Sequence, residues 1–194
     1  GYVEESQIAS TLKLIKKKGY IPVLGKYTLG KHYEGYNYSG TEIERIKDIN
    51  WAFNDDAIKA IWTTRGGYGC QHLLDHIDFK KFKKNPKWYI GYSDNTVIQS
   101  LLLKNNFESI HGQTLKTSSF GVTKESYDLV FDLLKGKFIK YILEPNDFNR
   151  KGKVEGQLVG GNLALIYALL GTKYSFNFKD KILFIEEIGE NFYA

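Results

Sequence analysis

The sequence predicts an α/β fold, in which a parallel sheet carries helices on both faces and is followed by the start of a smaller, truncated C-terminal domain. Strand-like and helix-like stretches alternate along the chain, and the links between them are short and contain glycine. A polar stretch with Pro, Asn, Asp and Gly interrupts this alternation. We therefore expect an N-terminal α/β domain at residues 1–144, a linker at 145–153 and an incomplete C-terminal domain at 154–194.

The predicted helices are stretches whose apolar residues recur every three or four positions. They are residues 4–18, 41–53, 70–76, 96–105, 127–134 and 163–170. Gly19, Gly136 and Gly171 can end three of these helices. Glu42 and Glu44 place acidic groups in the first turn of the second helix, where the helix dipole favours them.

The predicted strands are short runs rich in β-branched and aromatic residues. They are residues 20–24, 58–63, 88–90, 109–111, 138–143, 154–159 and 181–187. Residues 25–40 are rich in Gly, Tyr and Lys and have no clear period, so we expect a surface loop there.

The stretch that carries the strongest chemical signal is Gly91-Tyr92-Ser93-Asp94, between the strand at 88–90 and the helix at 96–105. A serine at a sharp strand-to-helix turn is lifted out of the sheet. The amides that follow it, at the helix N-terminus, can stabilise a developing negative charge. Ser93 is therefore a candidate nucleophile. The alternative is that Ser93 or Asp94 only caps the helix.

Two further features follow predicted strands. Arg65-Gly66-Gly67-Tyr68-Gly69 comes after the strand at 58–63, and its glycines allow the backbone to approach a ligand closely. Glu186 and Glu187 end the strand at 181–187 and point to opposite faces of it. Ligands of parallel sheets bind beyond the carboxyl ends of the strands, so the shared position of these features favours a site over a helix cap.

Three motifs together resemble the LD-carboxypeptidase family of serine peptidases, which also includes the microcin C self-immunity peptidases. The motifs are Arg65-Gly66-Gly67-Tyr68-Gly69, Gly91-Tyr92-Ser93-Asp94, and Leu158-Val159-Gly160-Gly161-Asn162-Leu163 with Ile182-Leu183-Phe184-Ile185-Glu186-Glu187. The resemblance implies a flavodoxin-like sheet whose first strand would precede Gly1. Asn95 departs from the pattern, because the family more often has an apolar residue there.

The resemblance implies a Ser-His-Glu triad with Ser93 as nucleophile and Glu186 as the triad glutamate. The oxyanion hole would be the amide of Asp94 with an amide of Gly66 or Gly67. None of the four histidines follows Glu186, so the triad histidine would lie beyond Ala194 and this fragment would be inactive or nearly so.

The resemblance also implies that Arg65, Tyr68, His111 and Asn162 bind substrate. His111 could instead replace the missing base, but a lining role is favoured. His72 and His76 have the i, i+4 spacing of some zinc ligands. They lack the glutamate of the zinc-peptidase pattern, so no metal site and no cofactor are predicted.

The implied function is removal of the terminal D-alanine from muropeptide tetrapeptides in cytoplasmic cell-wall recycling. The implied partner is a muropeptide or another small peptide, and a homodimer is compatible with it. One alternative is a self-immunity peptidase that cleaves a peptidyl-nucleotide antibiotic. Another is a non-catalytic α/β module that binds a small ligand, with Arg65 bracing the glycine loop.

Composition limits the other classes. The net charge is +5, and the lysine runs at residues 16–18 and 80–87 are expected to be solvated rather than to bind nucleic acid. The single Cys70 excludes a disulfide within the chain and suits a reducing compartment. Apolar runs fall short of the ~20 residues that span a bilayer, so no membrane association is predicted. The chain starts at Gly1 and contains no Met, so we expect the natural N-terminus to be absent.

Overall fold

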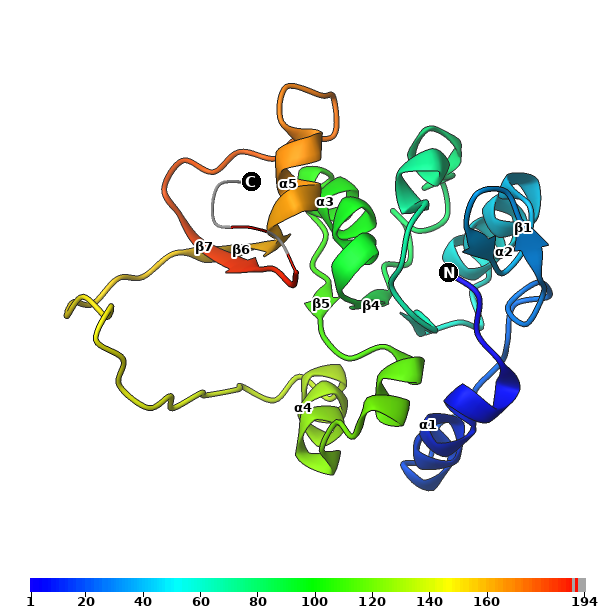
Figure 1. Cartoon of the computed structure of the whole chain (residues 1–194), viewed down its shortest axis with the longest axis horizontal. Coiled ribbons are helices and arrows are strands. Elements are labelled where there is room, and N and C mark those ends of the chain that lie inside the picture. Colours follow the sequence, from blue (N-terminus) through cyan, green and yellow to red (C-terminus); the bar gives the residue numbers. More distant parts are fainter. Residues whose placement is uncertain (190, 192–194) are drawn as a thin grey trace.

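The computed structural model describes residues 1–189 and 191 of the chain (Figure 1). Its helices and strands run in the order α1 (Glu5–Lys17), β1 (His32–Tyr33), β2 (Asn37–Tyr38), α2 (Glu42–Asn54), β3 (Ala60–Trp62), η1 (Cys70–His76), β4 (Trp88–Gly91), η2 (Ser93–Asn95), α3 (Thr96–Lys104), β5 (Ile110–His111), η3 (Leu115–Phe120), α4 (Lys124–Leu134), β6 (Gln157–Asn162), α5 (Leu163–Leu169) and β7 (Lys181–Glu186).

The central sheet has the order β3-β4-β5, and both strand pairs are parallel. Its middle strand, β4, is buried, and successive side chains enter different cores. Tyr89 packs with Phe53 of α2 and with the apolar face of α3. Ile90 packs with Val130 of α4 on the other side of the sheet. This arrangement confirms the predicted α/β fold with helices on both faces of a parallel sheet.

The C-terminal part is small and is built on a second parallel pair, β6 and β7. It docks on α3 beside the central sheet (Figure 1). The Asn162 amide donates to Thr96 Oγ1 at 3.0 Å. Gly161 is needed at this joint, because a Cβ there would lie 2.7 Å from Thr96 Cγ2. Leu165 and Leu169 of α5 pack onto the α2–α3 core.

Two predicted strands are wrong. Residues 20–24 form no described strand, and Ile21 is 89% exposed. A cavity of about 750 Å³ lies between this segment and β3. Residues 138–143 form part of the long loop between α4 and β6, and Phe138 is 95% exposed (Figure 1). Strand composition alone supplies no partner, and a strand without a hydrogen-bonded neighbour does not form.

Other predictions are corrected in detail. The predicted loop at residues 25–40 contains a short antiparallel hairpin of β1 and β2. The predicted helix at 70–76 is a 3₁₀-helix. β6 begins at Gln157 and continues through the two glycines to Asn162, because β7 pairs with it over that whole length. No helix in the described part of the chain is long and apolar enough to cross a membrane.

Candidate active site

Ser93 lies at the turn between β4 and α3, as predicted. Its φ of 60° is in the left-handed region, which is strained for any residue with a side chain. The preceding Gly91 allows the turn, because a Cβ there would lie 2.5 Å from Thr63 Oγ1. α3 begins without a side-chain capping hydrogen bond. The Ser93 hydroxyl therefore does not cap this helix, and the bend presents it at the strand end.

Asp94 is buried, and its carboxylate accepts a hydrogen bond of 2.9 Å from the Cys70 amide. The side chain thus joins the Ser93 turn to the start of η1. Burial and the neighbouring Asp94 raise the pKa of the Cys70 thiol well above its usual value. Cys70 therefore stays a neutral thiol at physiological pH.

The glycine loop lies directly against the candidate nucleophile. A Cβ on Gly66 would lie 2.8 Å from Ser93 Cβ and 3.0 Å from Ser93 Oγ. Gly67 has a φ of 115°, and a Cβ there would lie 2.4 Å from Tyr36 Oη. Only glycine fits at these two positions, and the loop backbone consequently reaches the Ser93 side chain.

Glu186, the last residue of β7, carries its carboxylate toward the same turn. Burial raises its pKa, and the negative charge of Glu187 adds to this. The nearby Ser93 backbone amide and Asn162 side chain oppose the rise in the pKa of Glu186. Glu186 Oε1 is buried and has no hydrogen-bond partner among the described residues. The end of β7 thus lies near the Ser93 turn, although the two residues belong to different sheets.

His111 faces Glu186 from the end of β5. Its Nε2 lies 3.7 Å from Glu186 Oε1, and its ring packs on Phe184 and Tyr92. Burial lowers the pKa of His111, so its neutral form is favoured. Because the imidazole is neutral and the distance is long, this contact is not a strong ion pair. His111 Nδ1 is buried and has no hydrogen-bond partner among the described residues.

Glu187 holds the start of α5. Its Oε1 accepts from Asn162 Nδ2 at 3.0 Å, and its Oε2 accepts from the Ala164 amide at 2.9 Å. Burial alone would raise the pKa of Glu187. The amides of Ile188 and Ala164 and the Asn162 side chain outweigh burial and lower it. The pKa values of the two glutamates are thus shifted in opposite directions, and the two carboxylates have different partners.

The other predicted substrate-binding residues already have contacts within the protein. Asn162 caps α5, because its Oδ1 accepts from the Leu165 amide at 3.2 Å. Arg65 Nη1 donates to the Tyr2 carbonyl at 3.0 Å. The Tyr68 ring is 48% exposed and meets the rings of Tyr36 and His72 edge-on. Of these, Tyr68 has the largest free surface, and all three substrate-binding roles stay predictions.

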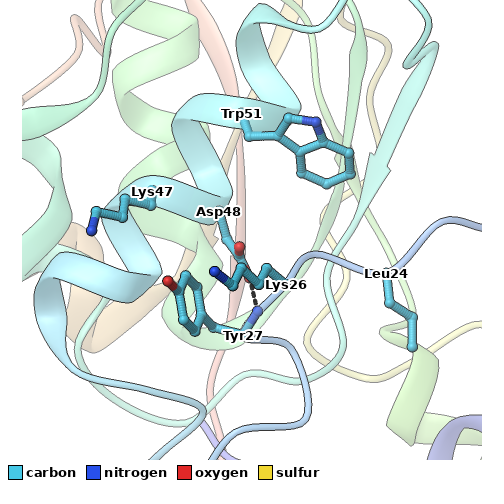
Figure 2. A pocket seen from close by; sticks show the side chains of 6 residues that line it. All are labelled: Leu24, Lys26, Tyr27, Lys47, Asp48 and Trp51. Carbon is cyan, nitrogen blue, oxygen red and sulfur yellow. Dashed lines mark hydrogen bonds between the residues drawn. The ribbon is translucent and has the colours of Figure 1, made fainter.

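Two other regions of the molecule differ from the Ser93 turn. In the described residues, no group of three or more His, Cys, Asp and Glu side chains is arranged to hold a metal ion. Residues 70–76 form a 3₁₀-helix, so His72 and His76 do not have the α-helical spacing on which a zinc pair depends. His72 Nδ1 lies 3.8 Å from a carboxylate oxygen of Glu42. A pocket of about 530 Å³ lies beside α2. Figure 2 shows the side chains that line it, among them Asp48, which accepts a hydrogen bond from the Tyr27 amide. Residues 24–51 supply all of its lining, so it is separate from the Ser93 turn.

Sequence reasoning missed one pair of buried residues at the turn. Asn95 is 2% exposed, and its Oδ1 accepts a hydrogen bond of 2.8 Å from Tyr89 Oη. The only signal in the sequence was the unusual polar residue after Asp94. Its burial and its partners depend on the packing of three segments.

Comparison with known proteins gives the family. Residues 1–112 match the LD-carboxypeptidase N-terminal domain, and residues 155–194 match the LD-carboxypeptidase C-terminal domain. The chain belongs to the LD-carboxypeptidase family. A probable murein peptide carboxypeptidase of Bacillus subtilis (strain 168) is 33% identical over 196 residues, which cover 98% of this chain and 60% of that protein. The murein tetrapeptide carboxypeptidase of Pseudomonas aeruginosa is 32% identical over 182 residues, covering 86% of this chain and 58% of that protein.

Two solved structures are similar to this chain in fold. The muramoyltetrapeptide carboxypeptidase from Oxalobacter formigenes has a TM-score of 0.79 at 27% identity, covering 95% of this chain and 62% of the other. The microcin C7 self immunity protein MccF in complex with glutamyl sulfamoyl guanosine has a TM-score of 0.77 at 27% identity, covering 94% and 63%. The chain spans 54–60% of the length of three curated relatives that it matches.

Proposed function

We propose that the protein is a serine-type LD-carboxypeptidase that removes the terminal D-alanine from muropeptide tetrapeptides during cell-wall recycling in the cytoplasm. The observation that carries this proposal is the strained turn at Ser93, which holds the hydroxyl against Gly66 with Glu186 close by. The names of the murein carboxypeptidase relatives support the substrate class.

In this proposal, Ser93 Oγ attacks the carbonyl carbon of the scissile peptide bond while a general base takes its proton. The amides of Asp94 and of Gly66 or Gly67 stabilise the oxyanion. The base then gives the proton to the departing D-alanine amine, and water hydrolyses the acyl-enzyme. Glu186 orients the base. The family resemblance implies that the base is a histidine later in the chain than Glu186, and none of the four histidines of this sequence has that position.

The test uses the full-length protein. Ser93→Ala is expected to abolish release of D-alanine from a murein tetrapeptide and to abolish labelling by a fluorophosphonate probe. Ser109→Ala, which changes a serine outside the turn, serves as the control and should keep both. Wild-type protein that neither releases D-alanine nor reacts with the probe would instead be a non-catalytic binding module.

A second candidate is cleavage of a peptidyl-nucleotide antibiotic. It is favoured by the likeness to MccF and by the exposed Tyr68 ring beside the glycine loop, on which a nucleobase could stack. Release of the amino acid from an aminoacyl sulfamoyl adenosine, faster than release of D-alanine from the tetrapeptide, would select this candidate. A homodimer stays a prediction, and light scattering of the full-length protein tests it.

A further inference from the structure

We propose that Asn95 is a positioning residue for Ser93. Its buried amide holds the Ser93 turn at a fixed spacing from the Gly66–Gly67 loop. The inference rests on the proposed function, because it assigns Asn95 to the reaction of the Ser93 hydroxyl.

The Asn95 side chain joins two segments that meet at the candidate site. Its Nδ2 donates to the Tyr92 carbonyl at 2.9 Å and, in a longer contact, to the Arg65 carbonyl at 3.5 Å. Tyr92 immediately precedes Ser93, and Arg65 immediately precedes Gly66. One amide group therefore contacts both the turn that carries the nucleophile and the loop that lies against it.

Tyr89 sets the orientation of this amide. Its hydroxyl donates to Asn95 Oδ1 at 2.8 Å, and both side chains are 2% exposed. Burial raises the pKa of the Tyr89 phenol well above its usual value, so the hydroxyl keeps its proton. Because Oδ1 can only accept, the donor end of the amide must then face the two carbonyls.

The Ser93 turn needs such support. A left-handed backbone at a residue with a side chain persists only where the surrounding structure enforces it. From the strand side, Asn95 packs into the space that Gly91 leaves, since a Cβ on Gly91 would lie 2.9 Å from Asn95 Cγ. From the loop side, Gly66 lies against Ser93. The Asn95 side chain contacts both segments.

A purely structural role for Asn95 predicts something different. Asn95→Leu leaves the buried Tyr89 hydroxyl without a partner, and this destabilises the fold. It also removes the side-chain hydrogen bond to the Tyr92 carbonyl, which keeps only the 3.3 Å bond from the backbone amide of residue 95. Tyr89→Phe/Asn95→Leu removes the unpaired hydroxyl as well, so part of the stability should return. The side-chain hydrogen bond from residue 95 to the Tyr92 carbonyl is still missing in the double variant. A positioning role predicts that the reaction does not recover with the stability.

Lys87 supplies a matched control. Its ammonium is buried and donates to the carbonyls of Ala52 and Phe53, at 3.0 and 3.1 Å, and to that of Asp55. These contacts lie at the end of α2 and involve no proposed site residue. Lys87→Met removes buried hydrogen bonds without touching the Ser93 turn. It therefore lowers stability alone.

The experiment measures four quantities on the full-length protein and its variants. They are kcat and KM for a murein tetrapeptide, the rate of fluorophosphonate labelling at Ser93, and the midpoint of thermal unfolding. Asn95→Leu and Tyr89→Phe/Asn95→Leu are expected to lower kcat and the labelling rate by at least about tenfold, with KM within about twofold. Lys87→Met should lower the midpoint and keep both rates.

Wild-type kcat and labelling rate in Tyr89→Phe/Asn95→Leu would overturn the positioning role. It would also be overturned if Lys87→Met, with the same unfolding midpoint as an Asn95 variant, lost as much kcat and labelling rate as that variant. Wild-type protein that is labelled at Ser93 but does not release D-alanine contradicts the proposed substrate. In that case the labelling rates still decide the role of Asn95. Wild-type protein without either reaction overturns both proposals.

Discussion

The two parallel sheets of this molecule hold the candidate site in different ways. The middle strand of the central sheet is enclosed, and its Ile90 is fully buried between helices. The β6–β7 pair is open, and Leu158 and Ile185 are 66% and 48% exposed. Ser93 thus follows a buried strand, whereas Glu186 ends an open strand pair that is joined to α3. The geometry of the site depends on that joint as much as on the strained turn.

The largest expected effect separates the two glutamates at the end of β7. In the full-length protein, Glu186→Gln should lower kcat by roughly 10³- to 10⁴-fold, because an amide orients and stabilises an imidazolium poorly. Glu187→Gln should leave kcat nearly unchanged and cost about 1 kcal/mol of stability, because it weakens the hydrogen bonds to Asn162 and Ala164. Steady-state kinetics and thermal unfolding check this pair, and equal kinetic losses would show that the wrong carboxylate was chosen.

A smaller effect is expected from the joint itself. Gly161→Ala places a methyl group 2.7 Å from Thr96 Cγ2 at a φ of 145°, so β6 must move away from α3. A displacement of about 1 Å at the carboxylate is expected to lower kcat by roughly 100-fold.

Gly156→Ala is the control for this substitution. Its added methyl group would meet only ordinary contacts, at 3.6 Å, and the backbone there is not left-handed. It should keep wild-type kcat. If Gly161→Ala also keeps wild-type kcat, the joint does not set the position of Glu186.

The same contrast explains how far the sequence could predict the site. Gly66 and Ser93 follow neighbouring strands of one parallel sheet, so their proximity was predictable. Glu186 ends a strand of the other sheet, and its position near Ser93 depends on the docking of β6 and α5 on α3. Alternation along β7 predicted that Glu186 and Glu187 face opposite ways. It did not predict which partners each would have.

Features that depend on distant partners were not predictable. Residues 20–24 have the composition of a strand, but composition contains no information about a pairing neighbour. Asn95 is polar and follows a polar turn, so its burial beneath that turn is visible only once β4, α3 and the glycine loop are packed together. The catalytic candidates could therefore be predicted from local sequence motifs, whereas the residues that support them are visible only in the packed structure.

The smallest expected effect is the pH dependence of the contact between the two sheets. Burial lowers the pKa of His111 below its unfolded value, so folding favours the neutral imidazole. Its contribution to stability is complete above the unfolded pKa of about 6.5 and is lost as the pH falls toward the folded pKa. Glu186 faces His111, and its pKa is raised because burial disfavours the charged carboxylate. Protonation of Glu186 on acidification therefore increases stability, which opposes the effect of His111.

The measurement is urea unfolding of the wild type and of His111→Gln between pH 7.5 and pH 5, as the difference in free energy of unfolding at each pH. His111→Gln should lose stability less steeply on acidification than the wild type, since it has no imidazole to protonate. If His111 only lines the site, kcat of His111→Gln in the full-length protein should stay within about tenfold of wild type. Parallel pH curves would show that His111 is not the titrating group. Loss of kcat as large as that of Ser93→Ala would instead make His111 the base that serves Ser93, and a histidine later in the chain than Glu186 would not be needed.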